Sequence, residues 1–188
     1  MQRAPHGNAL AQLVAAVPPP AEVVRIDWSE VEDRLGFLLP ADYRALMETY
    51  GEGSFDDFLW LLHPTSSNPN LNLIEELHAQ REALALDPDG IGPRPQELVP
   101  WASTDNGDSV YWKFDSERRL GSSVIVNESR GDAWPEYDLS ATEWLLAVLT
   151  GRIRVPVFPD DFPSRRPSFL RRAPRAGPPR QLRAWPLP

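Results

Sequence analysis

Two pairs of adjacent carboxylates are the side chains best suited to acid and base chemistry in this chain. Catalysis of that kind needs two carboxyl groups in unlike surroundings, and Asp56-Asp57 or Glu75-Glu76 could supply them. In a chain with 27 acidic residues, however, such neighbours are more commonly one solvated and one locally bonded side chain. We therefore predict no catalytic residues and no enzyme activity.

Metal, nucleophile and phosphate sites each lack their residue pattern. The three histidines are scattered, and no H-x-x-x-H, H-E-x-x-H or G-x-S-x-G motif is present. The D-N-G-D turn at 105–108 lacks the later glutamate of a calcium loop, and the G-E-G triplet at 51–53 follows an expected helix instead of opening one. The sequence therefore predicts no cofactor, no metal and no small-molecule substrate.

A protein-binding surface is the remaining kind of site. Three of the seven tryptophans sit near expected turns or strand ends beside acidic residues, where a partly exposed ring could anchor a partner. Burial in the core is the alternative for each of these rings. The predicted partner-binding residues, three tryptophans with an acidic rim, are Trp60, Trp101, Trp134, Asp56, Asp57, Asp105, Asp108, Asp132 and Glu136.

Charge divides the chain into two unlike parts. Residues 1–162 carry 27 acidic and 12 basic side chains, a net charge of −15, whereas residues 163–188 carry seven arginines and no acid. An acidic field repels nucleic acid and speeds association with cationic proteins. We therefore expect this acidic body to bind a basic protein and not nucleic acid. The arginine-rich end is expected either to bind anions or to lie transiently on the acidic body.

Two short helices have clear start and stop signals between Asp27 and Gly51. Asp27 is placed to cap the first helix, and Gly36 supplies its left-handed exit. Pro40 suits the first turn of the second helix, whose apolar stripe ends at Tyr50.

Further patterns predict an antiparallel sheet with a closing helix. A period of two predicts strands at 109–114 and 123–127, and apolar runs predict strands at 58–62 and 98–102. Ser140 and Glu143 form a capping box for the last helix. Additional helices are expected at 8–17 and 71–84, and core tryptophans at Trp28, Trp112 and Trp144. The fold class is α+β: short N-terminal helices packed with an antiparallel sheet of about three to five strands and a C-terminal helix, in a single domain.

Two longer motifs resemble a known family. The string W-x-x-V-E-x-x-L-G-F-x-L-P-x-D-Y-R-x-L-x-x-x-Y-G-x-G spans Trp28 to Gly53, and L-V-P-W-A-S-T-D-N-G-D-S-V-Y-W spans Leu98 to Trp112. Their content, order and separation resemble the landmarks of the Smi1/Knr4 family, also named the SUKH superfamily. With the closing helix, the resemblance covers residues 28–152.

The resemblance implies a non-catalytic binding protein. Bacterial members of this superfamily are regarded as immunity proteins that neutralise a cognate toxin, often a nuclease, and an acidic body suits a basic toxin. The fungal members suggest the alternative of a regulatory adaptor or scaffold. An enzyme with an unrecognised carboxylate site is a third class, which would require a deep pocket with strongly perturbed carboxylates.

Length and composition set the remaining expectations. We divide the 188 residues into an N-terminal helix with a proline linker (1–20), the Smi1/Knr4-like domain (21–155) and an extended or disordered Pro- and Arg-rich tail (156–188). A chain without cysteine has no disulfide framework. Because no signal peptide or long apolar run is present, we expect a soluble cytoplasmic protein without membrane insertion.

Overall fold

The centre of the molecule is an antiparallel sheet. A computed structural model describes residues 6–172 except for 22–24, 87–91, 116, 118 and 122. Within these ranges, seven strands pair in the order β6-β5-β4-β3-β2-β1-β7. The strands are β1 (Gly53–Phe55), β2 (Leu59–Leu61), β3 (Leu98–Thr104), β4 (Ser109–Lys113), β5 (Val124–Asn127), β6 (Glu136–Tyr137) and β7 (Phe169–Arg171).

The predicted α+β class is confirmed, but the sheet has more strands than the predicted three to five. Strands β1, β6 and β7 were not predicted, because segments of two or three residues are too short to show a period of two. They extend the predicted antiparallel sheet at both edges.

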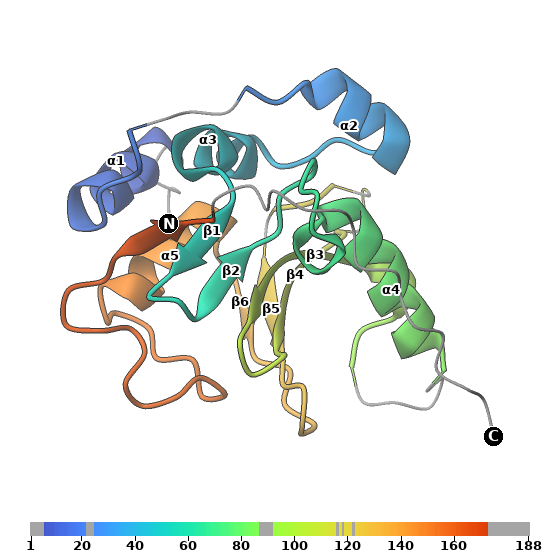
Figure 1. Ribbon diagram of the computed structural model, residues 1–188. Helices are drawn as coiled ribbons and strands as arrows, with labels where there is room; N and C mark the ends of the chain where they lie inside the picture. The colour runs from blue at the N-terminus through green and yellow to red at the C-terminus, as the bar shows by residue number, and fades with distance from the viewer. Residues whose placement is uncertain are drawn as a thin grey trace.

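Helices pack on both faces of the sheet. The helices are α1 (His6–Ala16), α2 (Trp28–Leu35), α3 (Ala41–Tyr50), α4 (Leu73–Ala85) and α5 (Ala141–Leu149), with short 3-10 helices η1 (Pro69–Leu71) and η2 (Pro95–Glu97). Figure 1 shows α1, α3 and α5 gathered on one side of the sheet and α4 on the other. We name the side covered by α1, α3 and α5 the inner face, because it carries the main core, and the opposite side the outer face.

The helix signals read from the sequence are present in the structure. The Asp27 carboxylate accepts the Glu30 N–H at 3.2 Å, and Gly36 has the left-handed φ of 75°. The capping box of Ser140 and Glu143 is complete. These local interactions start and stop α2 and α5 where the sequence predicted.

The strand register assigns side chains to the two faces. Leu61, Ala102, Val110 and Val126 lie opposite one another across four strands and are completely buried in the core of the inner face. The outer-face row runs across six strands and contains Leu170, Ser54, Trp60, Ser103, Ser109 and Asn127. The inner row is aliphatic and the outer row is mostly polar, with Trp60 near its centre.

Both ends of the chain contribute to the folded body. In α1, Leu13 is fully buried in the main core, so the predicted N-terminal helix packs against the domain. The prediction of an extended or disordered tail from residue 156 is wrong for residues 156–172. Phe158 and Phe162 are buried in the core, and Phe169 of β7 pairs with Phe55 of β1. Residues 173–188, the rest of that predicted tail, lie outside the described residues.

Candidate partner-binding surface

The sheet topology brings three hairpin turns to one end of the sheet. Successive antiparallel strands run in opposite directions, so the β1–β2, β3–β4 and β5–β6 turns share one end. These turns carry Asp57, Asp105 and Asp132, all exposed. We name this region the turn end. The predicted acidic residues therefore lie along the same end of the sheet although they are far apart in the sequence.

Trp60 and Asp105 form the clearest contact at the turn end. The Trp60 indole Nε1–H donates to Asp105 Oδ1 at 2.7 Å, and the Asp105 backbone N–H donates to the Phe58 carbonyl at 3.1 Å. These bonds fix the β3–β4 turn against β2. The Trp60 ring is partly exposed and the Asp105 side chain is exposed, so both remain available to a partner.

The prediction that Trp101 and Asp108 belong to the binding surface is wrong, because both side chains are buried. The β3–β4 register shifts between Pro100 and Ala102, and this bulge directs the Trp101 ring into the core, where it stacks on Trp112 at 5.7 Å. Asp108 is 3% exposed. Its carboxylate accepts the Thr104 hydroxyl at 2.8 Å and the Ser129 N–H at 3.1 Å, so it joins two hairpins.

Asp56 and Asp57 differ in their partners, although the sequence pattern suggested one locally bonded and one solvated carboxylate. The exposed Asp57 accepts the nearby Ser54 hydroxyl at 3.5 Å, whereas the bonds of Asp56 are not local. The Asp56 carboxylate accepts the backbone N–H groups of Ser164 and Ser168, each at 2.8 Å. The Asp56 N–H in turn donates to the Ser168 carbonyl at 2.9 Å. Asp56 therefore holds the segment that leads into β7, and Asp57 is the exposed member of the pair.

Trp134 lies against the outer face. Its ring stacks on Tyr111 at 6.0 Å, and a Cβ added to Gly92 would lie 2.6 Å from the ring. Trp134 is partly exposed, whereas Asp132 and Glu136 on either side of it are exposed. From Asp132 at the turn end, Trp134 and Glu136 continue the predicted surface beside the small cluster that Tyr111 makes with Leu84 of α4.

An apolar groove was not predicted from the sequence. It has a volume of about 450 Å³ and lies between residues 36–40 and the β4–β5 connection. Leu38 is 76% exposed and Leu39 is buried. The apolar run G-F-L-L-P at 36–40 could have indicated this groove. Two adjacent leucines, however, do not reveal which one faces solvent.

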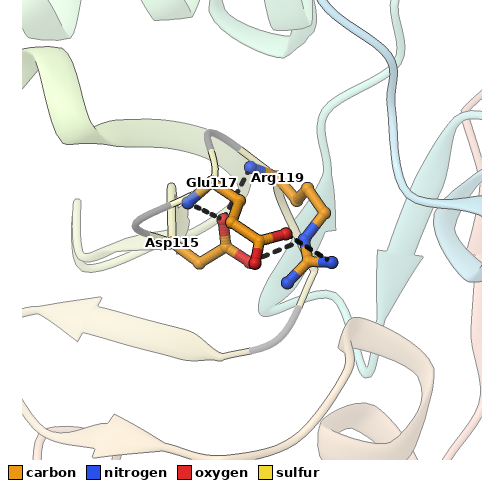
Figure 2. Close-up of polar contacts among 3 residues, drawn as sticks. All are labelled: Asp115, Glu117 and Arg119. Atoms are coloured by element: carbon orange, nitrogen blue, oxygen red, sulfur yellow. Dashed lines mark hydrogen bonds and ion pairs between the residues drawn. The ribbon is translucent and has the colours of Figure 1, made fainter.

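A small ion-pair network borders this groove. Arg119 Nε lies 2.9 Å from Asp115 Oδ2, and Arg119 Nη1 lies 2.9 Å from Glu117 Oε2 (Figure 2). The backbone N–H of Arg119, followed by its guanidinium, holds the pKa of Asp115 below its usual value. The network is exposed and shapes the loop, so it is a weak contributor to stability.

Burial shifts the pKa values of two further side chains, His63 and Glu76. Burial, followed by the charge of Arg171, lowers the pKa of His63 to about 4, and burial raises the pKa of Glu76 on α4. Among the described residues, no three His, Cys, Asp or Glu side chains are grouped to hold a metal ion. No helix in the same ranges has the length and apolar composition to cross a membrane.

Comparison with known families identifies the family of this chain. The sequence profile described as "SMI1-KNR4 cell-wall", a SUKH family, matches residues 26–145. The chain belongs to this SMI1-KNR4 family. Searches of curated proteins and of solved structures returned no match.

The SMI1-KNR4 motif residues mainly hold the fold together. In the D-Y-R segment, the Asp42 carboxylate accepts the Thr142 N–H of α5 at 3.0 Å, and the Tyr43 hydroxyl donates to the Leu62 carbonyl. In the N-G-D segment, Asp108 is the buried link between hairpins. These motif residues therefore join α3 to α5 and one hairpin to the next.

Proposed function

We propose that this protein is a non-catalytic binding protein and, more specifically, an immunity protein that neutralises a cognate, basic bacterial toxin in the cytoplasm. Membership of the SMI1-KNR4 family supports the binding role. The observation that carries the site is the Trp60–Asp105 contact at the turn end. It pairs a tryptophan, a residue type that anchors the centre of protein interfaces, with an exposed carboxylate of the kind found in their polar rim.

The charge of the acidic body favours a cationic partner. Residues 1–162 have a net charge of −15, and at the turn end Asp57, Asp105, Asp132 and Glu136 are exposed. Nuclease surfaces that bind phosphate are cationic. An acidic protein can cover such a surface by replacing the charge of the nucleic acid, and the long-range field raises the rate of encounter.

The revised partner-binding residues follow from the exposure of each predicted residue. Trp101 and Asp108 are removed because they are buried, and Asp56 because its carboxylate is already bonded to the chain. The proposed surface therefore consists of Asp57, Trp60, Asp105, Asp132, Trp134 and Glu136.

The test is a pull-down of the protein product of the neighbouring gene, followed by titration calorimetry at two salt concentrations. We expect one-to-one binding that weakens as salt rises, because exposed charges are screened over about 8 Å at physiological ionic strength. Absence of binding at micromolar concentration, with the protein folded, would reject the immunity role and favour the adaptor alternative.

A further inference from the structure

The described chain ends on the outer face of the sheet. Arg172 follows β7, and its guanidinium carbon lies 5.9 Å from the centre of the Trp60 ring. The Arg172 N–H donates to the Glu52 carbonyl at 3.1 Å, which fixes the point where the chain leaves β7. Residues 173–188 follow directly. They therefore begin on the surface that carries Trp60.

This surface has features that suit a cationic segment. Trp60 and Ser103 are partly exposed, and Leu170 is 50% exposed. Asp57 and Asp105 lie at the turn-end edge of the same group. We name these five residues the Trp60 face. Figure 1 shows that α4, the described helix on this side of the sheet, lies to the right of β1 and β2, and its main contacts in the sheet are with β3.

We propose that residues 173–188 of this chain dock on the Trp60 face through their arginines. The segment contains Arg175, Arg180 and Arg183 and no acidic residue. Arg172, which precedes this segment, already makes the kind of contact proposed for it. Its guanidinium lies over the Trp60 ring, as in a cation–π contact. The Asp105 carboxylate receives the Trp60 indole on Oδ1, and described residues make no other hydrogen bond to it.

The segment is long enough for this contact. Trp60 lies on β2, two strands from β7, which corresponds to about 10 Å at the usual strand spacing. The three residues from Arg172 to Arg175 span about 10 Å when extended. Arg175 can therefore reach the Trp60 ring. Because β7 runs away from the turn end, the segment must turn back for its later arginines to reach Asp105 and Asp57. Because the segment is tethered, its effective concentration is about millimolar.

Docking of this segment regulates partner binding. A basic partner on the Trp60 face must displace the tethered arginines, so the segment competes with it and selects for partners that bind more strongly. This competition rests on the proposed function, whereas the docking itself does not.

The experiment measures the proximity of the segment to Trp60 in the full-length chain. The protein has no cysteine, so Ala176→Cys provides a single attachment point for a nitroxide spin label. In nitrogen-15 spectra we expect the Trp60 indole N–H and the Ser103 amide to lose most of their intensity, and to recover it when salt is raised. The matched control carries the same label with R175Q/R180Q/R183Q, which keeps the tether and removes the charge.

The possible results separate the proposal from its alternatives. Recovery of the Trp60 signal in the arginine variant supports docking by charge. Equal intensity losses in both labelled proteins would overturn the proposal, since the tether alone would account for them. Losses that arise only when labelled and isotope-enriched chains are mixed would overturn it in favour of a second copy. Partner calorimetry is independent of this readout, so failure of the proposed function and failure of docking are distinguishable.

Discussion

The inner and outer faces of the sheet use tryptophan in opposite ways. On the inner face, Trp101, Trp112 and Trp144 are completely buried, and their indole N–H groups have no hydrogen-bond partner among the described residues. On the outer face, the Trp60 indole donates to the exposed carboxylate of Asp105. The inner rings therefore stabilise the fold by burial and ring contacts, whereas Trp60 is fixed in place but left available for contact.

The same difference applies to the aspartates. Asp42 and Asp108 are buried and bonded to backbone groups of distant elements. Asp57 and Asp105 are exposed at the turn end. Substitutions that affect stability and substitutions that affect binding should therefore fall on different residues of the same type.

The largest expected difference is between Trp101→Ala and Trp60→Ala. Removing the Trp101 ring leaves a cavity in the main core and should lower the free energy of unfolding by about 3–5 kcal/mol. Trp60→Ala should cost about 1 kcal/mol or less, because the ring is partly exposed. Urea unfolding of both variants measures the two values. Equal losses would show that the two faces do not differ in the way described.

The buried His63 should make the free energy of unfolding depend on pH. Its pKa is lowered by burial from 6.5 to about 4, so the unfolded chain binds the proton first as pH falls. The free energy of unfolding should therefore be highest above pH 6.5 and fall by about 3 kcal/mol between pH 6.5 and pH 4 because of this group.

The measurement is a series of urea titrations across this pH range. His63→Gln should remove this part of the pH dependence. His78→Gln, at an exposed position of α4, controls for the loss of a histidine. An unchanged slope in the His63 variant would disprove the contribution.

Asp42 tests whether a buried motif aspartate joins α3 to α5. Asp42→Ala leaves the buried Thr142 N–H without its acceptor, which should cost about 1–3 kcal/mol. Asp42→Asn keeps an oxygen at this position and should cost less. Thermal unfolding compares the two, and equal losses would contradict the role of the hydrogen bond.

The smallest expected effect separates the two neighbouring aspartates. Asn tolerates the left-handed φ of 50° at Asp56 and 56° at Asp57, so substitution to Asn changes mainly the charge. Asp56→Asn should cost about 1 kcal/mol and speed amide exchange at Ser164 or Ser168, because the amide has one acceptor where the carboxylate has two. Asp57→Asn should leave exchange unchanged. Faster exchange in both variants would argue against a specific role for Asp56.

Local signals were the predictable part of this fold. The caps of α2 and α5 involve side chains within three residues of their targets, and the N-G-D turn sets the β3–β4 hairpin within one short segment. In each case the interaction energy depends on neighbours along the chain.

Distant contacts were not predictable from the sequence. Strand β7 pairs with β1, and the Asp56–Ser168 bond joins residues 112 positions apart, so no local pattern marks either one. A bulge decides the burial of Trp101. Trp28, expected in the core, is only partly buried, since its indole donates to exposed Glu48 at 2.7 Å.

The central claim is that partner binding depends on the turn end and not only on the overall acidity of the body. Titration calorimetry of the partner with D57N/D105N and with E30Q/D33N tests it directly, because both variants remove two exposed acids, the second pair from α2. We predict that D57N/D105N weakens binding about tenfold or more, a loss of about 1.4 kcal/mol, and that E30Q/D33N has little effect. Equal weakening by both variants, or none by D57N/D105N, would contradict the account.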